Sequence, residues 1–204
     1  MAMTEDEPLP GTSQEKISNP TSPGQPAGSS KDMAFPACGD FDMRIASDGT
    51  WFYRGSPIGR KALVKLFSTV IRRDDHGDFW LVTPVERGRI QVDDAPFTAV
   101  ELAVSGSGEA QVLRFRNNVD DWVEAGPEHP IRVETNPETL EPRPYITVRD
   151  RLEALILRPL FYELVELSVE REAGQAKAGP ENVSQGSELG IWSNGVFFPL
   201  GSPA

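Results

Sequence analysis

Two stretches of the chain carry nearly the same sequence, and they decide the fold that we expect. Residues 45–57 read IASDGTWFYRGSP and residues 191–203 read IWSNGVFFPLGSP, with seven of thirteen aligned positions identical. Each copy places Asp-Gly or Asn-Gly between short apolar runs. This is a strong hairpin signal, because a type I′ turn needs φ > 0 at both central residues. The pair indicates an internal duplication, unless the likeness of two ordinary hairpins is chance.

Composition limits the classes of protein to consider. The 204 residues carry a net charge of −11, which argues against nucleic acid and anionic membrane as partners. No apolar run approaches the roughly 18 residues that span a bilayer, and the N-terminus lacks a signal-peptide pattern. The single cysteine, Cys38, excludes an intramolecular disulfide. We therefore expect a soluble, cytoplasmic protein.

Polar segments divide the chain. Residues 1–34 are rich in Pro, Gly, Ser and acidic residues, so we expect a disordered tail. The polar stretch at about 171–187 is typical of a mobile loop. The remainder mixes helical and strand patterns, which predicts an α+β fold with packed helices on antiparallel strands. We place an N-terminal α+β domain at 35–98 and a C-terminal one at 99–204.

Local signals predict individual elements. Ser56-Pro57 is typical of a helix start, and apolar residues at helical spacing follow, so we expect a helix that ends near Arg72-Arg73. Asp150 suggests the cap of a second helix, which Pro159 would break or kink. Strand patterns occur at 78–85, 90–92, 97–104, 110–116, 122–124, 131–134 and 145–148.

No residue pattern indicates a reaction. The two histidines, His76 and His129, lie in turn sequences, and Cys38 has no basic neighbour that would lower its pKa. The acidic run around Asp74 does not match the spacing of a calcium loop. We therefore predict no catalytic residue, no metal site and no cofactor.

Arginines and aromatic residues gather late in the chain. The set comprises Arg143, Arg149, Arg151, Arg158, Tyr145, Phe161 and Tyr162, with Arg114, Asn117 and Asn118 from an earlier strand end. An arginine beside an aromatic face can bind a phosphate and stack a base. Carboxylates such as Glu141 and Glu153 lie nearby in sequence, so arginine–carboxylate pairs that fix helix to sheet are the other interpretation.

Five blocks of the chain resemble a known family. They are DGTWFYRGSPI (48–58), LVTPVERGRIQVDDAPF (81–97), RFRNNVDD (114–121), EPRPYITVRDRLEALILRPLFYELVEL (141–167) and IWSNGVFFPLG (191–201). In order and content they resemble the bacterial domain-of-unknown-function family 1285, over nearly everything after the tail. The resemblance implies a duplicated α+β core with a C-terminal half superficially like a pleckstrin-homology fold. It also implies a crevice between the halves for a nucleotide-like ligand and a role in signalling, but no catalytic residue.

We therefore predict a module that senses an anionic, nucleotide-like small molecule at the interface of two domains. The candidate ligand-binding residues are Arg149, Arg143 and Arg114 for the anion, Tyr145 and Trp192 for stacking, and Asn118 as a polar contact. The alternative is an interaction adaptor without a small ligand, which accepts a strand from a protein partner at a sheet edge. A hydrolase of a phosphorylated metabolite is a third hypothesis. It lacks histidine, thiol and metal motifs, so an enzyme is the less favoured prediction.

Overall fold

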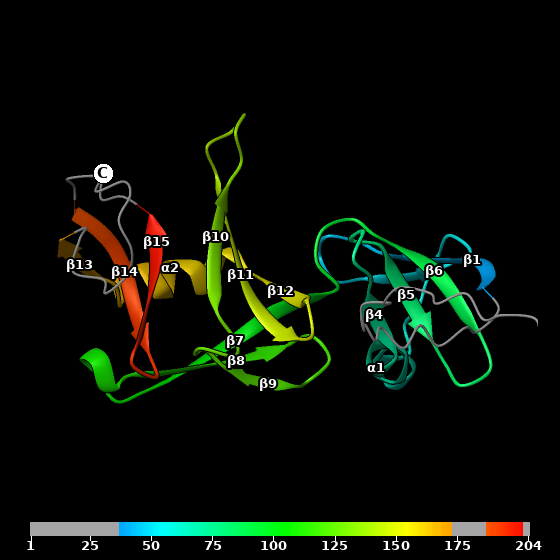
Figure 1. Ribbon diagram of the computed structural model, residues 1–204, viewed down its shortest axis with the longest axis horizontal. Helices are drawn as coiled ribbons and strands as arrows, with labels where there is room; N and C mark the ends of the chain where they lie inside the picture. The colour runs from blue at the N-terminus through cyan, green and yellow to red at the C-terminus, as the bar shows by residue number, and fades with distance from the viewer. Residues whose placement is uncertain (1–36, 173–186, 202–204) are drawn as a thin grey trace, which may run out of the picture. The chain divides into compact units, whose positions relative to one another are not determined.

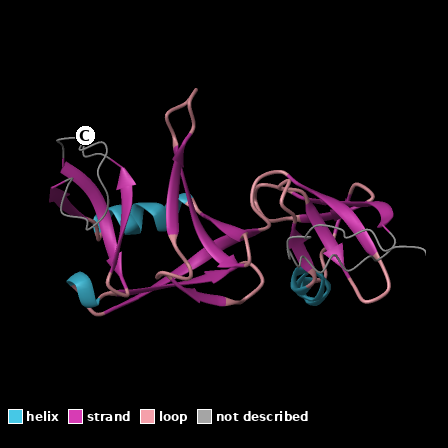
Figure 2. Cartoon of the chain, in the orientation of Figure 1, coloured by secondary structure: helices cyan, strands magenta, loops and turns pink. Residues whose placement is uncertain are grey.

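Three β-sheets make up most of the computed structural model, which describes residues 37–172 and 187–201 (Figures 1 and 2). Two α-helices and one 3-10 turn complete the described elements. The fold is thus α+β with strands predominating. The tail expected at 1–34 and most of the loop expected at 171–187 lie outside the described residues. No helix in the described ranges is long and apolar enough to cross a membrane.

The first sheet comes from the N-terminal part of the chain and has the strand order β3-β2-β1-β6-β5-β4. Its strands are β1 (Ala37–Ile45), β2 (Trp51–Tyr53), β3 (Ser56–Pro57), β4 (Ile71–Arg73), β5 (Phe79–Val82) and β6 (Arg87–Val92). The central strands β1 and β6 are parallel, and the other paired strands are antiparallel. Helix α1 (Lys61–Thr69) covers one face, where Phe67 stacks on the buried Trp51 at 6.2 Å between ring centroids.

The second sheet has the order β10-β11-β12-β7-β8-β9, and a third sheet has the order β13-β14-β15. Their strands are β7 (Phe97–Ser105), β8 (Val112–Asn117), β9 (Trp122–Glu124), β10 (Ile131–Thr135), β11 (Pro142–Arg149), β12 (Leu152–Ile156), β13 (Val169–Glu172), β14 (Ser187–Ser193) and β15 (Val196–Gly201). A 3-10 turn (Gly108–Ala110) joins β7 to β8, and α2 (Arg158–Glu166) follows β12. One cluster of buried apolar side chains extends from the first sheet through the second to the third.

The first helix begins later than its sequence signal. Ser56 and Pro57 form β3, which pairs with β2, so the expected helix start at these residues is wrong. The turn before β3 is tight, with positive φ at Arg54 (49°) and Gly55 (74°), and it returns the chain to the sheet. The helix starts at Lys61 without a side-chain cap and ends at Thr69, because the next residues pair with β5.

The expected second helix after Asp150 is also wrong. Residues Leu152, Ala154 and Ile156 are buried in alternation along β12. The apolar residues of this segment fit both a helical and a strand spacing, and pairing with β11 and β7 decides for the strand. Pro159 does not break a helix but lies in the first turn of α2, where its missing N–H has no partner to lose.

The two similar hairpins have different turns. Asn194 and Gly195 both have positive φ, at 49° and 72°, in the two-residue turn that the sequence predicts. In the first hairpin only Gly49 has positive φ (84°), and its N–H donates to the Ala46 carbonyl in a longer loop. The type I′ prediction is therefore wrong there, because one positive φ suffices for that loop. The duplication and the pleckstrin-homology likeness both stay predictions.

Candidate functional site

The first and second sheets meet at a polar junction. The side-chain amide of Asn118 donates to the carbonyl of Gly49 at 3.2 Å, and Lys61 of α1 pairs with Asp120 at 2.9 Å. Arg151 bonds to the carboxylate of Asp75 at 2.8 Å and to a main-chain carbonyl of β4 at 3.1 Å. These charged and polar contacts join the segment before Asp94 to the strands after it, in addition to the apolar cluster that both share.

A cavity of about 190 Å³ lies at this junction. It is lined by Arg73, Phe79, Asp94, Ala95, Pro96, Arg132, Glu134, Tyr145, Arg151 and Glu153. We call it the junction pocket. Strands β4 and β5 of the first sheet and β10, β11 and β12 of the second contribute to its lining. Its volume suits one phosphate or carboxylate group and is below the range of about 300–1,000 Å³ that encloses a whole small ligand.

Two of the pocket's carboxylates already hold strong partners. Glu153 accepts two bonds from the guanidinium of Arg132, at 2.5 and 2.7 Å, and that guanidinium lies 4.4 Å from the ring centre of Tyr145. Asp94 accepts a bond of 2.8 Å from the Tyr145 hydroxyl and an ion pair from Arg143. Burial and the nearby Asp94 raise the pKa of Tyr145. These carboxylates therefore have little left to offer a ligand.

Two of the pocket's arginines lack a close, buried carboxylate partner, although each also bonds the other's main-chain carbonyl, at 3.5 Å from Arg73 and 3.1 Å from Arg151. The nearest carboxylate oxygen to Arg73 belongs to Glu153, at 3.9 Å, and its guanidinium lies 5.3 Å from the ring centre of Phe79. The ion-pair partner of Arg151 is Asp75, whose side chain is 91% exposed. Because an arginine carries five N–H donors and exposed ion pairs are weak, Arg73 and Arg151 retain donors for an anion.

Arg149, one of the candidate anion contacts, is the last residue of β11. Its Nη2 donates to the main-chain carbonyl of Ser68 in α1, and its guanidinium lies 5.3 Å from the ring centre of Phe97. Burial, and then the charge of Arg72, lowers the pKa of Arg149. The side chain thus ties the end of α1 to the end of β11, and it does not line the junction pocket.

The other predicted residues are distributed over the fold. Arg143 and Tyr145 meet at Asp94, whereas Arg114 lies on β8 with Glu124 at 3.3 Å and the ring of Trp122 at 5.3 Å. The ring of Trp192 on β14 packs edge-on against Phe197 at 5.3 Å. Asn118 bonds the main chain on both sides of the junction.

Sequence reasoning did not name Arg73, Arg132 or Phe79 as residues of a binding site. Strand register brings these residues together, because Arg132 lies directly opposite Tyr145 in the β10–β11 pair and Arg73 lies opposite Phe79 in the β4–β5 pair. The signal that could have found them is the arginine–aromatic pairing across two adjacent strands.

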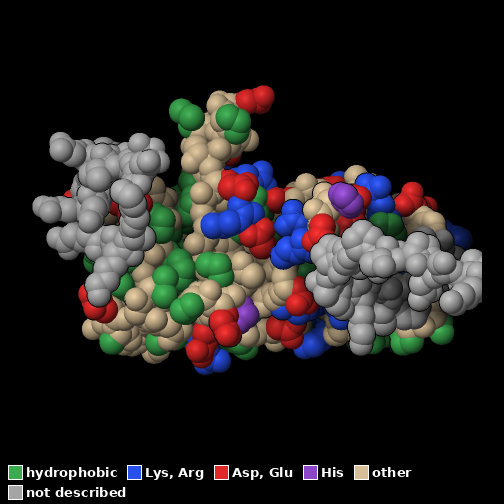
Figure 3. Space-filling view, viewed as in Figure 1, with side chains coloured by type: hydrophobic (Ala, Val, Ile, Leu, Met, Phe, Trp, Pro, Cys, Tyr) green, Lys and Arg blue, Asp and Glu red, His purple; other side chains and the backbone are tan. Residues whose placement is uncertain are grey.

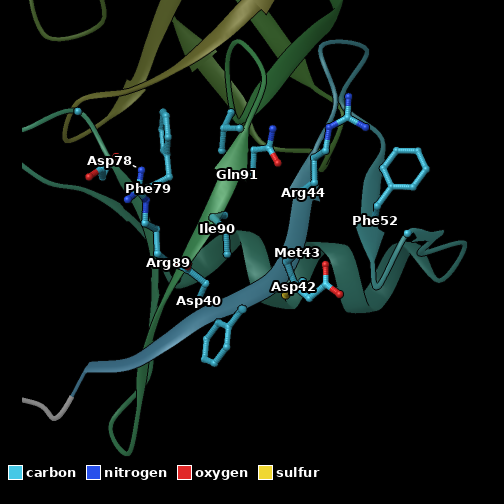
Figure 4. A pocket seen from close by; sticks show the side chains of 14 residues that line it. Asp40, Asp42, Met43, Arg44, Phe52, Asp78, Phe79, Arg89, Ile90 and Gln91 are labelled. Carbon is cyan, nitrogen blue, oxygen red and sulfur yellow. Dashed lines mark ion pairs between the residues drawn. The ribbon is translucent and has the colours of Figure 1, made fainter.

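A larger cavity, of about 940 Å³, lies over the first sheet (Figure 4). Figure 4 shows Arg89 beside Asp78, paired at 2.9 Å, and Arg44 beside Phe52, with 5.8 Å from the guanidinium to the ring centre. Arg44 also pairs with Asp93. Both arginines of this cavity thus hold a carboxylate, and its lining includes more acidic than basic residues, so it suits an anion less well than the junction pocket.

The charge on the surface is mixed. On the face that Figure 3 shows, Lys and Arg side chains lie among Asp and Glu side chains and form no separate basic patch. Within the described ranges, no group of three or more His, Cys, Asp and Glu is placed to hold a metal ion.

The chain is thus an α+β protein whose N-terminal sheet meets a second, larger set of strands at a polar junction with one small, arginine-lined pocket. Two family models match it: the N-terminal domain of unknown function DUF1285 over residues 33–95, and the C-terminal domain of proteins of unknown function DUF1285 over residues 96–200. The chain belongs to the DUF1285 family.

Two crystal structures of similar proteins are also DUF1285 family members. The one from Silicibacter pomeroyi DSS-3 is 48% identical over 82% of this chain and 84% of that chain, with a TM-score of 0.71. The one from Shewanella baltica OS155 is 22% identical over 61% of this chain and 91% of that chain, with a TM-score of 0.48. No curated protein matches the sequence.

Proposed function

We propose that this protein binds an anionic, nucleotide-like small molecule at the junction of its two domains, with the phosphate group in the junction pocket. One observation carries the proposal. The guanidinium groups of Arg73 and Arg151 line one cavity, and neither has a close, buried carboxylate partner. Arginine is the side chain best suited to a phosphate, because its planar fork matches two phosphate oxygens at once.

The cavity limits how the ligand lies. A volume of about 190 Å³ admits the phosphate and leaves the nucleoside part at the mouth. Phe79, over which Arg73 lies, is the aromatic ring from the first sheet in the pocket lining. A flat base that stacks on an exposed aromatic or guanidinium face gains binding free energy without any specific hydrogen bond.

Binding at this place supports a sensing role. Arg73 belongs to the N-terminal domain and Arg151 to the C-terminal one. A phosphate that bonds both links the two domains, so the ligand stabilises their contact more as its concentration rises above its Kd.

Thermal unfolding with a panel of nucleotides, cyclic nucleotides and nucleotide cofactors tests the proposal. A ligand at a hundredfold excess over its Kd stabilises the folded state by about 2.7 kcal/mol, which raises the melting temperature by roughly 5–10 °C for a chain of this size. The matching nucleosides, which lack phosphate, should give no shift. Arg73→Ala and Arg151→Ala should each cut the shift to about half or less, because a Kd at least about tenfold higher leaves at most a tenfold excess of ligand. The proposed site leaves out the candidate Arg114, which does not line the junction pocket and lies beside Glu124 and the ring of Trp122, so Arg114→Ala should keep the shift.

The adaptor hypothesis makes the opposite prediction. If no compound of the panel raises the melting temperature at millimolar concentration while a protein partner is captured without any small ligand, the chain acts as an interaction module. In that case Arg73→Ala should leave the capture unchanged.

A further inference from the structure

A second concave surface lies between the start of β11, the end of β12 and the first turns of α2. Its volume is about 450 Å³, within the range of sites that enclose a small organic molecule. It shares no lining residue with the junction pocket. We call it the α2 groove.

The wall of the α2 groove is largely apolar. Its apolar lining includes Pro142 and Pro144 of β11, Leu155 of β12, and Phe161 and Tyr162 of α2. Tyr162 is 59% exposed although it is a large aromatic residue. An apolar concavity of this size that stays open to water favours a ligand with an apolar body.

The polar end of the groove is cationic. Arg158, the first residue of α2, bonds Glu141 at 3.0 Å, and both side chains are more than half exposed, at 64% and 56%. The other arginine of the lining, Arg143, is held by Asp94. Arg158 is therefore the cation whose present partner is an exposed, weakly held carboxylate that a ligand can replace.

The helix itself adds to this preference. Its N-cap residue, Leu157, provides no capping side chain, and the first turn contains no acidic residue. The positive end of the helix dipole thus lies at the cationic end of the groove without a compensating charge from its own turn. This favours an anion beside Arg158 and disfavours an amine.

We propose that the α2 groove binds an organic monocarboxylate with an apolar chain. The carboxylate takes the place of Glu141 on the guanidinium of Arg158, and the chain covers Leu155 and Phe161. This site is distinct from the phosphate site at the junction, and neither needs the other.

Calorimetric titration of the full chain with hexanoate, octanoate and decanoate tests this site. Each added methylene should tighten binding by about fourfold, because it is buried in the groove. Octylamine has the same chain and the opposite charge and should not bind, and 1-octanol should bind more weakly than octanoate. Equal affinity of octanoate and octylamine would overturn the proposal, as would the absence of binding by all three carboxylates.

Two exposed variants give effects of opposite sign. Arg158→Gln should weaken octanoate binding at least about tenfold through loss of the charged hydrogen bond. Glu141→Gln should tighten it a few-fold, because the competing carboxylate is gone. Arg114→Gln is the matched control and should leave the affinity unchanged. If Glu141→Gln weakens binding or Arg158→Gln leaves it unaltered, the carboxylate does not bind at Arg158.

The proposal for the junction pocket and the proposal for the α2 groove can be tested independently. Arg73→Ala should leave octanoate binding unchanged, and Arg158→Gln should leave the nucleotide-induced shift unchanged. Loss of octanoate binding in Arg73→Ala, in a protein that still unfolds cooperatively, would place the carboxylate at the junction and overturn the groove proposal.

Discussion

Arg149 donates a hydrogen bond from its Nη2 to the main-chain carbonyl of Ser68, so a side chain at the end of β11 holds the last turn of α1. The carbonyls at a helix end lack partners within the helix, and a guanidinium there also suits the dipole. The contact joins the two domains through a residue that the sequence indicated as a ligand contact. Loss of this hydrogen bond should therefore lower the stability of the folded protein, and any effect on ligand binding should follow from that.

Arg149→Ala should lower the free energy of unfolding by about 2 kcal/mol, because a half-buried hydrogen bond from a charged group is lost together with the contact to Phe97. Arg149→Lys should recover only part, since an ammonium cannot match the planar contact with the ring. Urea unfolding measures both. The account of this contact is wrong if Arg149→Ala is as stable as Arg114→Ala.

The hydrogen bonds that Asp74 accepts lead us to expect that the folded protein loses stability in acid. The indole N–H of Trp80 donates to its Oδ2 at 2.8 Å, and the main-chain N–H groups of His76 and Asp78 donate to its Oδ1 at 3.0 and 2.9 Å. The bond from Trp80 is the largest cause that lowers the pKa of Asp74. Between the lowered folded-state pKa and the ordinary unfolded value near 4, the unfolded state binds more protons, so the stabilisation is present above pH 4 and is lost as the pH falls.

The measurement is the free energy of unfolding from pH 7 to pH 2. Asp74→Asn should flatten the loss of stability below pH 4. Asp75→Asn in the same turn is the control, because Asp75 is 91% exposed and pairs only at the surface with Arg151, and it should keep the acid dependence of the parent. Identical pH profiles for Asp74→Asn and the parent would contradict this role of Asp74.

The repeated sequence provides a matched pair of serines. Ser193 is fully buried, and its hydroxyl accepts from the N–H of Leu113 at 2.9 Å and donates to the carbonyl of Ala125 at 2.8 Å. Its counterpart in the first copy, Ser47, is exposed. Ser193→Ala leaves a buried N–H without its partner and should destabilise the fold by about 2 kcal/mol, whereas Ser47→Ala should change stability by less than about 0.5 kcal/mol. Thermal unfolding distinguishes them, and equal effects would contradict this assignment.

Local patterns predicted the strands better than the helices. The strand at 122–124 has the predicted bounds, and the other predicted strands overlap observed ones, because alternating burial leaves a direct trace in the sequence. Ser56-Pro57 misled because a helix-start signal also fits a short edge strand, and pairing with β2 decides. The segment after Asp150 was predicted as a helix because the spacing of its apolar residues fits both a helix and a strand. Only pairing with its neighbours β11 and β7 selects the strand.

The site could be predicted only in part. Arg143 and Tyr145 are close in sequence and share a strand, and the structure brings both to Asp94. Arg73 and Arg132 come from β4 and β10, and only sheet register and the meeting of two sheets bring them to one pocket. Sequence proximity does not encode such contacts. For the same reason the sequence did not show that Arg149, central to the predicted cluster, donates a hydrogen bond to a main-chain carbonyl of α1.

Calorimetric titration of the full chain with pyrophosphate tests the central claim most directly, because this probe carries the phosphate without the base. The account predicts saturable binding that is at least about tenfold weaker in Arg73→Ala and in Arg151→Ala and unchanged in Arg114→Ala. Absence of binding to the parent protein, or equal binding by the parent and Arg73→Ala, would contradict the claim that the junction pocket holds a phosphate.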